Sequence, residues 1–255
     1  MNGAFYIGAT GLRAQQASAD VTAHNLANMN TVAFKRATLS FAELIAAPSP
    51  ELAATRPSEH GLSGVALVDP VQNFAPGNLR QTGNELDLAI RGKGFIELLG
   101  PSGQNLLWRG GTLRVNDDGF LAAENGMQLK TMISVPRDTA SLRIADTGEV
   151  LAYVGTDTTE QTLGRLELVQ PRDTRKLHNL GGAIYRLDDT YAGLGTAEAG
   201  EEGLGYFAQG FSEASNVELT EEIVSMMVMQ RAYAANAKLI QAGDELMGIV
   251  NGLKR

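Results

Sequence analysis

Histidines, acidic side chains and one glycine-rich turn are the parts of this sequence that could support catalysis or metal binding. His24 lies in a predicted helix, His60 in a proline-containing segment and His178 in a predicted loop. None of them has a second ligand at the spacing of a zinc or iron site. The chain has no cysteine, so thiolate ligands, thiol nucleophiles and disulfides are absent. The sequence therefore predicts no metal centre.

The remaining candidates are better explained as turns. The segment RGKGF, residues 91–95, lacks both the third glycine of a dinucleotide loop and the ending of a P-loop, and it leads into a strand-like run. Asp117 and Asp118 lack the other ligands of a twelve-residue calcium loop. No spacing indicates two carboxylates that share a cleft. We therefore predict a protein that is not an enzyme and needs no cofactor.

Composition limits the partners of the chain. Its 255 residues are 44% hydrophobic and 20% charged, enough for one large core or two smaller ones. The net charge of −8 and only 21 Lys and Arg argue against binding nucleic acid. The start, MNGAFYIGATGLR, has no basic region, and no apolar stretch approaches the roughly 20 residues of a membrane span. We expect neither a cleaved signal peptide nor membrane insertion.

The N-terminal segment predicts a helix with a narrow apolar seam. The seam alternates steps of four and three residues, with one polar member: Phe5, Ala9, Leu12, Gln16, Ala19, Ala23 and Leu26. Asn25, Asn28 and Asn30 are typical of a helix end, because Asn tolerates the left-handed conformation and binds freed backbone groups. We predict that this helix stops at the Asn cluster.

A second, longer helix is predicted to begin between residues 216 and 221. Ser215 with Glu218 has capping-box spacing, and Thr220 followed by two acids is an alternative start. Steps of three and four then define a seam flanked by Leu239, Leu246 and Leu253: Met226, Met229, Tyr233, Asn236, Ile240, Gly243, Met247 and Val250. The pattern allows two readings, in which the helices either pack on a central domain or serve a partner chain.

Between the helices the hydrophobic period becomes that of strands. Short runs such as LDLAI, FIELL, LRVND, SLRIA, VLAYV and RLELV are separated by turn signals, including those at residues 117–119 and 124–126. Residues 46–61 carry three of the eight prolines and show no period, which is typical of a linker.

These elements predict an α+β fold. Residues 1–30 and 216–255 form paired, coiled-coil-like terminal helices, residues 31–76 form a linker or extended segment, and residues 77–215 form an inserted, mainly antiparallel β domain.

Three segments carry a family resemblance. GLRAQQASADVTAHNLANMNTVAFKR resembles the N-terminal signature of bacterial flagellar rod and hook proteins, along the lines of G-L-x-A-x-Q-x-x-x-D-x-x-A-N-N-L-A-N-x-x-T-x-G-F-K-R. SNVELTEEIVSMMVMQRAYAANAK is similar to that family's C-terminal segment, and GNELDLAIRGKGFIEL to its S-x-D-x-A-I-x-G-x-G-F-F-x-V stretch. The departures are His24 for the usual Asn, Ala33 for the usual Gly and Ala235 near the usual Glu. Ala33 affects the expected geometry of the local turn, because glycine adopts positive φ most readily.

The resemblance implies a structural subunit of the flagellar basal-body rod. In that family the terminal helices pair at the inner wall of a tubular polymer, the β domain lies outside, and export uses the flagellar type III apparatus without a cleaved signal. The implied location is the basal body, in the periplasm. Length and the QRAY tail favour the distal rod type, with a proximal rod or hook subunit as the alternative and an exported adhesin or carbohydrate-binding β module as the alternative outside the family.

The implied partners are copies of the chain, adjoining rod and hook subunits, the surrounding basal-body rings and the export apparatus. The residues expected at the assembly interface come from both ends of the chain: Phe5, Leu12, Ala19, Asn25, Leu26, Asn28, Asn216, Val217, Met226, Met229, Arg231, Tyr233, Ile240 and Met247.

Overall fold

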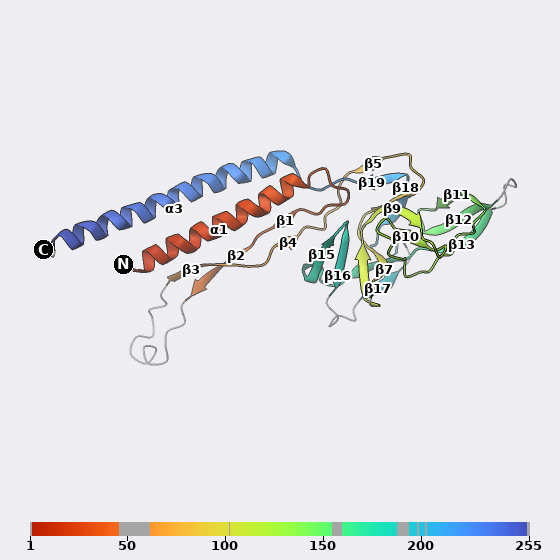
Figure 1. Cartoon of the computed structure of the whole chain (residues 1–255), viewed down its shortest axis with the longest axis horizontal. Helices are drawn as coiled ribbons and strands as arrows, with labels where there is room; N and C mark the ends of the chain where they lie inside the picture. Colours follow the sequence, from red (N-terminus) through yellow and green to blue (C-terminus); the bar gives the residue numbers. More distant parts are fainter. Residues whose placement is uncertain are drawn as a thin grey trace. The chain divides into compact units, whose positions relative to one another are not determined.

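The structure is a computed structural model that divides into two compact units (Figure 1). The first unit contains Met1–Ala27, Ala37–Asn73 and Glu218–Arg255, and the second contains Asn28–Arg36 and Phe74–Val217. The described residues are 2–45, 62–101, 103–154, 160–187, 194–197, 199–201 and 203–253. The predicted linker at residues 46–61 lies outside them.

The first unit is built on two long helices, α1 (Asn2–Ala27) and α3 (Leu219–Leu253), which run antiparallel beside each other (Figure 1). Two small antiparallel sheets accompany them. β1 (Ala37–Thr38) pairs with β4 (Val71–Gln72), and β2 (Phe41–Ile45) pairs with β3 (Leu62–Leu67), which also contacts α1.

α1 ends and α3 begins where local side-chain chemistry indicates. α1 stops at Ala27, and the Asn cluster forms the turn that follows: the Thr31 amide donates to the Asn28 carbonyl at 3.0 Å. α3 starts at Leu219 with Glu221 and Glu222 in its first turn, where carboxylates favour the helix dipole. The predicted helix stop is therefore confirmed, and the second helix starts within the predicted window.

The second unit is made of antiparallel strands, listed here with their bounds: β5 (Leu79–Gln81), β6 (Asp87–Arg91), β7 (Ile96–Leu99), β8 (Asn105–Trp108), β9 (Gly110–Val115), β10 (Leu121–Ala123), β11 (Thr139–Ile144), β12 (Glu149–Val154), β13 (Glu160–Arg165), β14 (Leu168–Pro171), β15 (Leu177–Gly181), β16 (Ile184–Leu187), β17 (Leu194–Ala197), β18 (Tyr206–Gln209) and β19 (Phe211–Glu213). A short 3-10 helix, η1 (Thr174–Lys176), precedes β15.

Two four-stranded sheets organise this unit, with the orders β10-β9-β6-β18 and β15-β16-β8-β7. The orders of the smaller sheets are β11-β12-β13, β14-β17 and β19-β5. Every strand pair is antiparallel, so the α+β prediction with antiparallel sheets is confirmed at this level.

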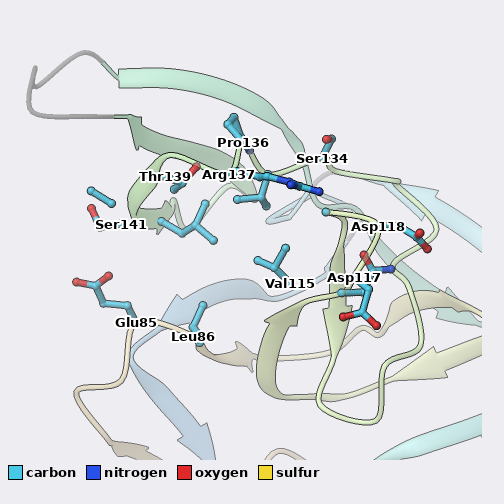
Figure 2. Close-up of a pocket in the computed structure, with 15 residues that line it drawn as sticks. Glu85, Leu86, Val115, Asp117, Asp118, Ser134, Pro136, Arg137, Thr139 and Ser141 are labelled. Carbon is cyan, nitrogen blue, oxygen red and sulfur yellow. The ribbon is translucent and has the colours of Figure 1, made fainter.

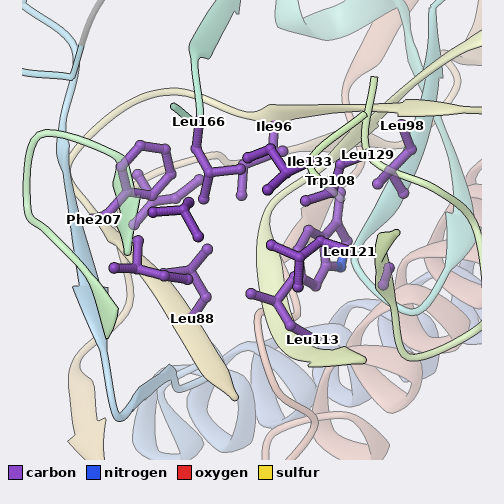
Figure 3. Packing of buried hydrophobic residues seen from close by; sticks show 14 of the residues in the cluster. Leu88, Ile96, Leu98, Trp108, Leu113, Leu121, Leu129, Ile133, Leu166 and Phe207 are labelled. Atoms are coloured by element: carbon purple, nitrogen blue, oxygen red, sulfur yellow. The ribbon is translucent and has the colours of Figure 1, made fainter. Parts of the chain in front are cut away.

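The core of the second unit forms where the buried faces of these strands meet. Figure 3 shows Leu88, Ile96 and Leu121 converging with Trp108 and Phe207, all of them nearly inaccessible to water. A second buried cluster surrounds the ring of Tyr185. All six runs predicted as strands contribute to β6, β7, β9, β11, β12, β13 or β14, because alternation of apolar residues reports which face of a strand is buried.

The predicted turns are also present. The RGKGF segment connects β6 to β7, with φ of 121° at Gly92 and 127° at Gly94. Positive φ is also found at Gly119, between β9 and β10, and at Gly126. These glycines supply backbone conformations that other residues rarely adopt, so they serve geometry rather than phosphate binding.

Ala33 is an exception to this use of glycine. It has φ of 54° although it is not glycine, and it is buried. Its amide donates to the Glu213 carbonyl at 2.7 Å. The chain therefore forms this left-handed turn without glycine, at a conformational cost of about 1 kcal/mol.

Candidate assembly surfaces and buried polar groups

Glycines allow α1 to approach α3 closely. A Cβ atom added at Gly8 would lie 2.9 Å from Cγ1 of Ile240, and one added at Gly11 would lie 3.0 Å from Nδ2 of Asn236. Thr22 and Asn25 continue the buried side of α1 further along the helix. The contact face of α1 is therefore small and polar rather than apolar.

The facing side of α3 carries most of the predicted C-terminal seam. Glu222 and Met229 are buried, and the half-buried members are Met226, Asn236, Ile240, Gly243 and Met247. Tyr233 and Arg231 are exposed. Leu239, Leu246 and Leu253, which flank the seam in the sequence, are strongly exposed.

The predicted N-terminal seam lies beside the α1 contact face rather than on it. Leu12, Ala19 and Leu26 are half-buried, whereas Ala9, Gln16 and Ala23 are exposed. The side chain of Phe5 lies outside the described residues. Apolar periodicity thus located a stripe of α1 beside its contact with α3, and missed the Gly8 and Gly11 face because glycine carries no apolar signal.

Asn25 is buried in the last turn of α1 and holds the returning chain. Its Nδ2 donates to the Ala37 carbonyl at 2.8 Å, and its Oδ1 accepts from the Ala37 amide at 2.9 Å. Nδ2 also lies 3.5 Å from Oε2 of Glu222. Such pairing reproduces one rung of a β ladder, so Asn25 fixes the segment that follows the loop.

Asn216 makes a similar pair of contacts within the second unit. Its Oδ1 accepts from the Arg36 amide at 2.7 Å, and its Nδ2 donates to the Ala75 carbonyl at 3.0 Å. Asn216, Val217 and Asn28 are all half-buried. Each of the two Asn residues, 25 and 216, therefore satisfies backbone groups of a segment distant in sequence.

A buried charge network joins three distant parts of the second unit. Lys35 Nζ lies 2.7 Å from Oε1 of Glu213, and Arg109 Nε lies 2.9 Å from Oε2 of the same carboxylate. All three side chains are at most 2% exposed. The Gly77 amide also donates to Oε1 of Glu213, at 2.8 Å. One carboxylate therefore compensates two buried cations.

Backbone carbonyls complete the network. Lys35 Nζ donates to the Ala75 carbonyl at 3.0 Å, and the Arg109 guanidinium donates to the carbonyls of Gly92 and Gly94. Burial lowers the pKa of Lys35 below its usual value, opposed by the charge of Glu213 and supported by that of Arg109. The two glycines of the RGKGF segment, which was predicted to be a turn, thus bind a protein cation through their carbonyl groups.

An aromatic cluster adjoins the network. Phe74, Phe95 and Tyr185 pack edge to face with ring centroids 5.1–5.7 Å apart, and the Arg109 guanidinium lies 5.9 Å from the centroid of Phe95. The Tyr185 hydroxyl has no hydrogen-bond partner among the described residues. Burial raises the pKa of this phenol above its usual range.

One concavity of the second unit has a volume of about 640 Å³ (Figure 2). Val115, Asp117 and Asp118 line it together with Arg137 and Thr139. It lies at a turn between strands, and its charged groups are of both signs. Among the described residues no three His, Asp or Glu side chains gather as a metal site would require, and no described helix is long and apolar enough to cross a membrane.

Comparison with protein families identifies the class of protein that these elements define. The family model described as "Flagella basal body rod protein" matches residues 5–35, and "Flagellar basal body rod FlgEFG protein C-terminal" matches residues 208–253. The family model described as "Flagellar hook protein FlgE/F/G D1 domain" matches residues 89–152, within the second unit.

Full-length relatives specify the type. The flagellar basal-body rod protein FlgG of Caulobacter vibrioides is 32% identical over 96% of this chain and 97% of its own length, and FlgG of Agrobacterium fabrum is 32% identical over 97% and 98%. FlgF of Caulobacter vibrioides is 28% identical over 96% and 95%. The chain belongs to the flagellar basal-body rod protein family, and the FlgG relatives support the distal rod type.

The family expectation is thus confirmed, and the alternative of an adhesin or carbohydrate-binding module loses its support. The family is one of structural proteins. Sequence reasoning found the segments that the family shares but missed Lys35, Arg109 and Glu213 as a group. No local pattern marks them, because the residues that neutralise each other are far apart in the chain.

Proposed function

We propose that this chain polymerises with copies of itself into the distal rod, a stiff helical tube that transmits torque across the periplasm. The observation that carries the proposal is similarity to FlgG proteins over nearly the whole chain, including both terminal helices. α1 and α3 then form the coiled-coil-like inner wall of the tube. The second unit lies outside it.

The partners follow from this role. The subunit contacts copies of itself, adjoining rod and hook subunits and the surrounding basal-body rings, after export by the flagellar type III apparatus without a cleaved signal. A proximal rod or hook subunit is the second candidate, because the FlgF relative and the hook-protein D1 description also match. Stiffness is consistent with the charge network and with the Asn25 and Asn216 contacts, which restrain the segments around residues 35–37.

The residues proposed to make the assembly interface are those predicted from the two ends of the chain. Leu12 and Leu26 supply apolar surface on α1, whereas Ile240 and Met247 act within the helix pair, where Ile240 lies against Gly8 of the same chain. Tyr233 and Arg231 are exposed on α3 and therefore accessible to another subunit. Asn25 and Asn216 act indirectly, through the backbone segments that they hold.

A motility assay with two charge substitutions tests the proposal. Leu26→Asp or Ile240→Asp places an unpaired carboxylate in the helical wall, at several kcal/mol for each subunit. Both residues belong to the first unit, so the melting temperature of the second unit is expected to stay unchanged while rods and swimming are lost. The matched control is Glu160→Lys, an exposed residue whose change is worth a few tenths of a kcal/mol. Normal rods and swimming in both Asp variants would refute the assembly role of the helices.

A further inference from the structure

α3 carries a second apolar stripe, which we call the outer stripe. It comprises Val228, Ala235, Leu239, Ala242, Leu246, Ile249 and Leu253. All seven are exposed, and the five larger side chains are 59–83% exposed. A soluble monomer rarely leaves so many large apolar side chains in one row, so the stripe indicates a protein partner.

The outer stripe cannot be covered by α1 of the same chain. An α-helix turns by about 100° per residue. On α3 the outer stripe is therefore centred roughly 120° away from the face that holds Met229, Asn236 and Ile240, which is the face that contacts α1. Its exposure follows from this angle rather than from a loose helix pair.

α1 also has a stripe that is only partly covered, called here the α1 stripe. It is the N-terminal apolar seam, with described members Ala9, Leu12, Gln16, Ala19, Ala23 and Leu26, all exposed or half-buried. By the same rotation it is centred roughly 80° from the Gly8 and Gly11 face. β3 contacts the opposite flank of α1, where the Val65 amide donates to the Thr10 hydroxyl at 3.5 Å, so this contact lies away from the α1 stripe.

The antiparallel arrangement puts the two stripes on opposite sides of the helix pair. On α1, the stripe is reached from the contact face by rotating about the helix axis in the sense in which residue numbers increase. On α3, the outer stripe is reached by rotating in the opposite sense. Because the helices run in opposite directions, these rotations have the same sense when viewed from one end. The contact faces point at each other, so equal rotations carry the α1 stripe to one side of the pair and the outer stripe to the other.

We propose that the outer stripe of one copy packs against the α1 stripe of the next copy, with the two helices antiparallel. This inference rests on the proposed function and names the surfaces that carry it. Two different surfaces on opposite sides of one molecule make a heterologous contact, which adds copies without limit unless the rotation closes a ring. A second copy is the occupant because each stripe provides the surface that the other lacks.

The spacing and size of the stripes support this pairing. Both advance in steps of four, three or seven over about three heptads, so an antiparallel alignment sets most residues of the α1 stripe opposite a residue of the outer stripe. In one such register Leu12 faces Leu246, and Ala19 faces Leu239. Each large apolar side chain removes roughly 100 Å² from water. With both surfaces counted the contact buries on the order of 1,000 Å², the size at which specific interfaces begin.

Cysteine cross-linking tests the proposal without reaction at native thiols of this chain, because the chain has no cysteine of its own. The double variant Ala23→Cys with Ala235→Cys places one thiol on each stripe, and Ala19→Cys with Ala242→Cys tests a different register. Each variant replaces the resident gene copy in the source bacterium. Isolated basal bodies are treated with a short bis-maleimide and analysed on a denaturing gel. We expect a ladder of dimers, trimers and larger species from at least one pair.

Controls separate this inference from the proposed function. His24→Cys with Gln241→Cys, exposed positions turned by more than 90° from the centres of both stripes, is expected to give monomers, as is each single variant. Basal bodies that contain the chain but give no ladder from either pair would overturn the stripe pairing and leave the rod function standing. Dimers from a single variant would also overturn it, since they require a symmetric contact. If basal bodies isolated from the bacterium with the unmodified gene do not contain this chain, the rod function itself is refuted.

Discussion

Replacing Glu213 by Gln tests whether one carboxylate holds the buried network together. Gln keeps the shape of the side chain but removes the charge that compensates Lys35 and Arg109, both at most 2% exposed. It also points amide protons toward cations. Removing one partner of a buried ion pair costs about 3–5 kcal/mol, because the remaining charge stays out of water.

That cost is large compared with the stability of a domain, typically about 5–15 kcal/mol. For a unit of this size each kcal/mol shifts the melting temperature by about 2–4 °C. We therefore expect Glu213→Gln to lower the melting temperature of the purified full-length chain by roughly 10 °C or more, measured by circular dichroism. Glu160→Gln, which removes an exposed carboxylate 3.8 Å from Arg143, is the matched control with a shift near zero.

A double variant distinguishes charge compensation from simple packing. Loss of Glu213 removes the charge that raises the pKa of Lys35, so the lysine becomes harder to keep protonated. Adding Lys35→Met to Glu213→Gln removes one of the two uncompensated cations. We therefore expect the double variant to lose about 2 kcal/mol less unfolding free energy than the sum of the losses in the two single variants. A cost of Glu213→Gln below about 1 kcal/mol, or strict additivity, would refute this reasoning.

Other parts of the fold give further tests. Tyr185→Phe removes a buried hydroxyl without a described partner, so we expect equal or higher stability at pH 7, by up to about 1 kcal/mol. Because burial raises the pKa of Tyr185, this group causes no pH dependence of stability below about pH 10, and stability falls as pH rises further; the wild type should lose more stability there than Tyr185→Phe in pH-dependent melts. Asn25→Ala removes both hydrogen bonds to Ala37 and is expected to cost about 2 kcal/mol in chemical unfolding, whereas the exposed Asn30→Ala costs little. A fragment of residues 77–215 should melt at a lower temperature than residues 28–217 in calorimetry, since it lacks Lys35 and Phe74; equal melting temperatures would contradict the importance of those contacts.

Local patterns in the sequence determined the elements and the family. Steps of three and four residues indicated both terminal helices, alternation indicated the strands, and glycine-containing turns such as residues 117–119 indicated where strands reverse. These signals are readable because helix and strand periods and turn conformations depend on neighbouring residues. The motifs at the two ends and in the middle were sufficient to predict the family that the comparisons confirmed.

Tertiary structure decided which surfaces are used and how buried charges are balanced. The apolar stripe of α1 was predictable, but its own α3 packs on Gly8 and Gly11 instead, because small residues permit a close approach that hydrophobic periodicity does not report. Lys35, Arg109 and Glu213 belong to segments separated by more than seventy residues from one another, so only the folded chain reveals that they neutralise each other. The positive φ of Ala33 is maintained in the same way: long-range contacts, including the hydrogen bond from the Ala33 amide to the Glu213 carbonyl, outweigh a local preference of about 1 kcal/mol.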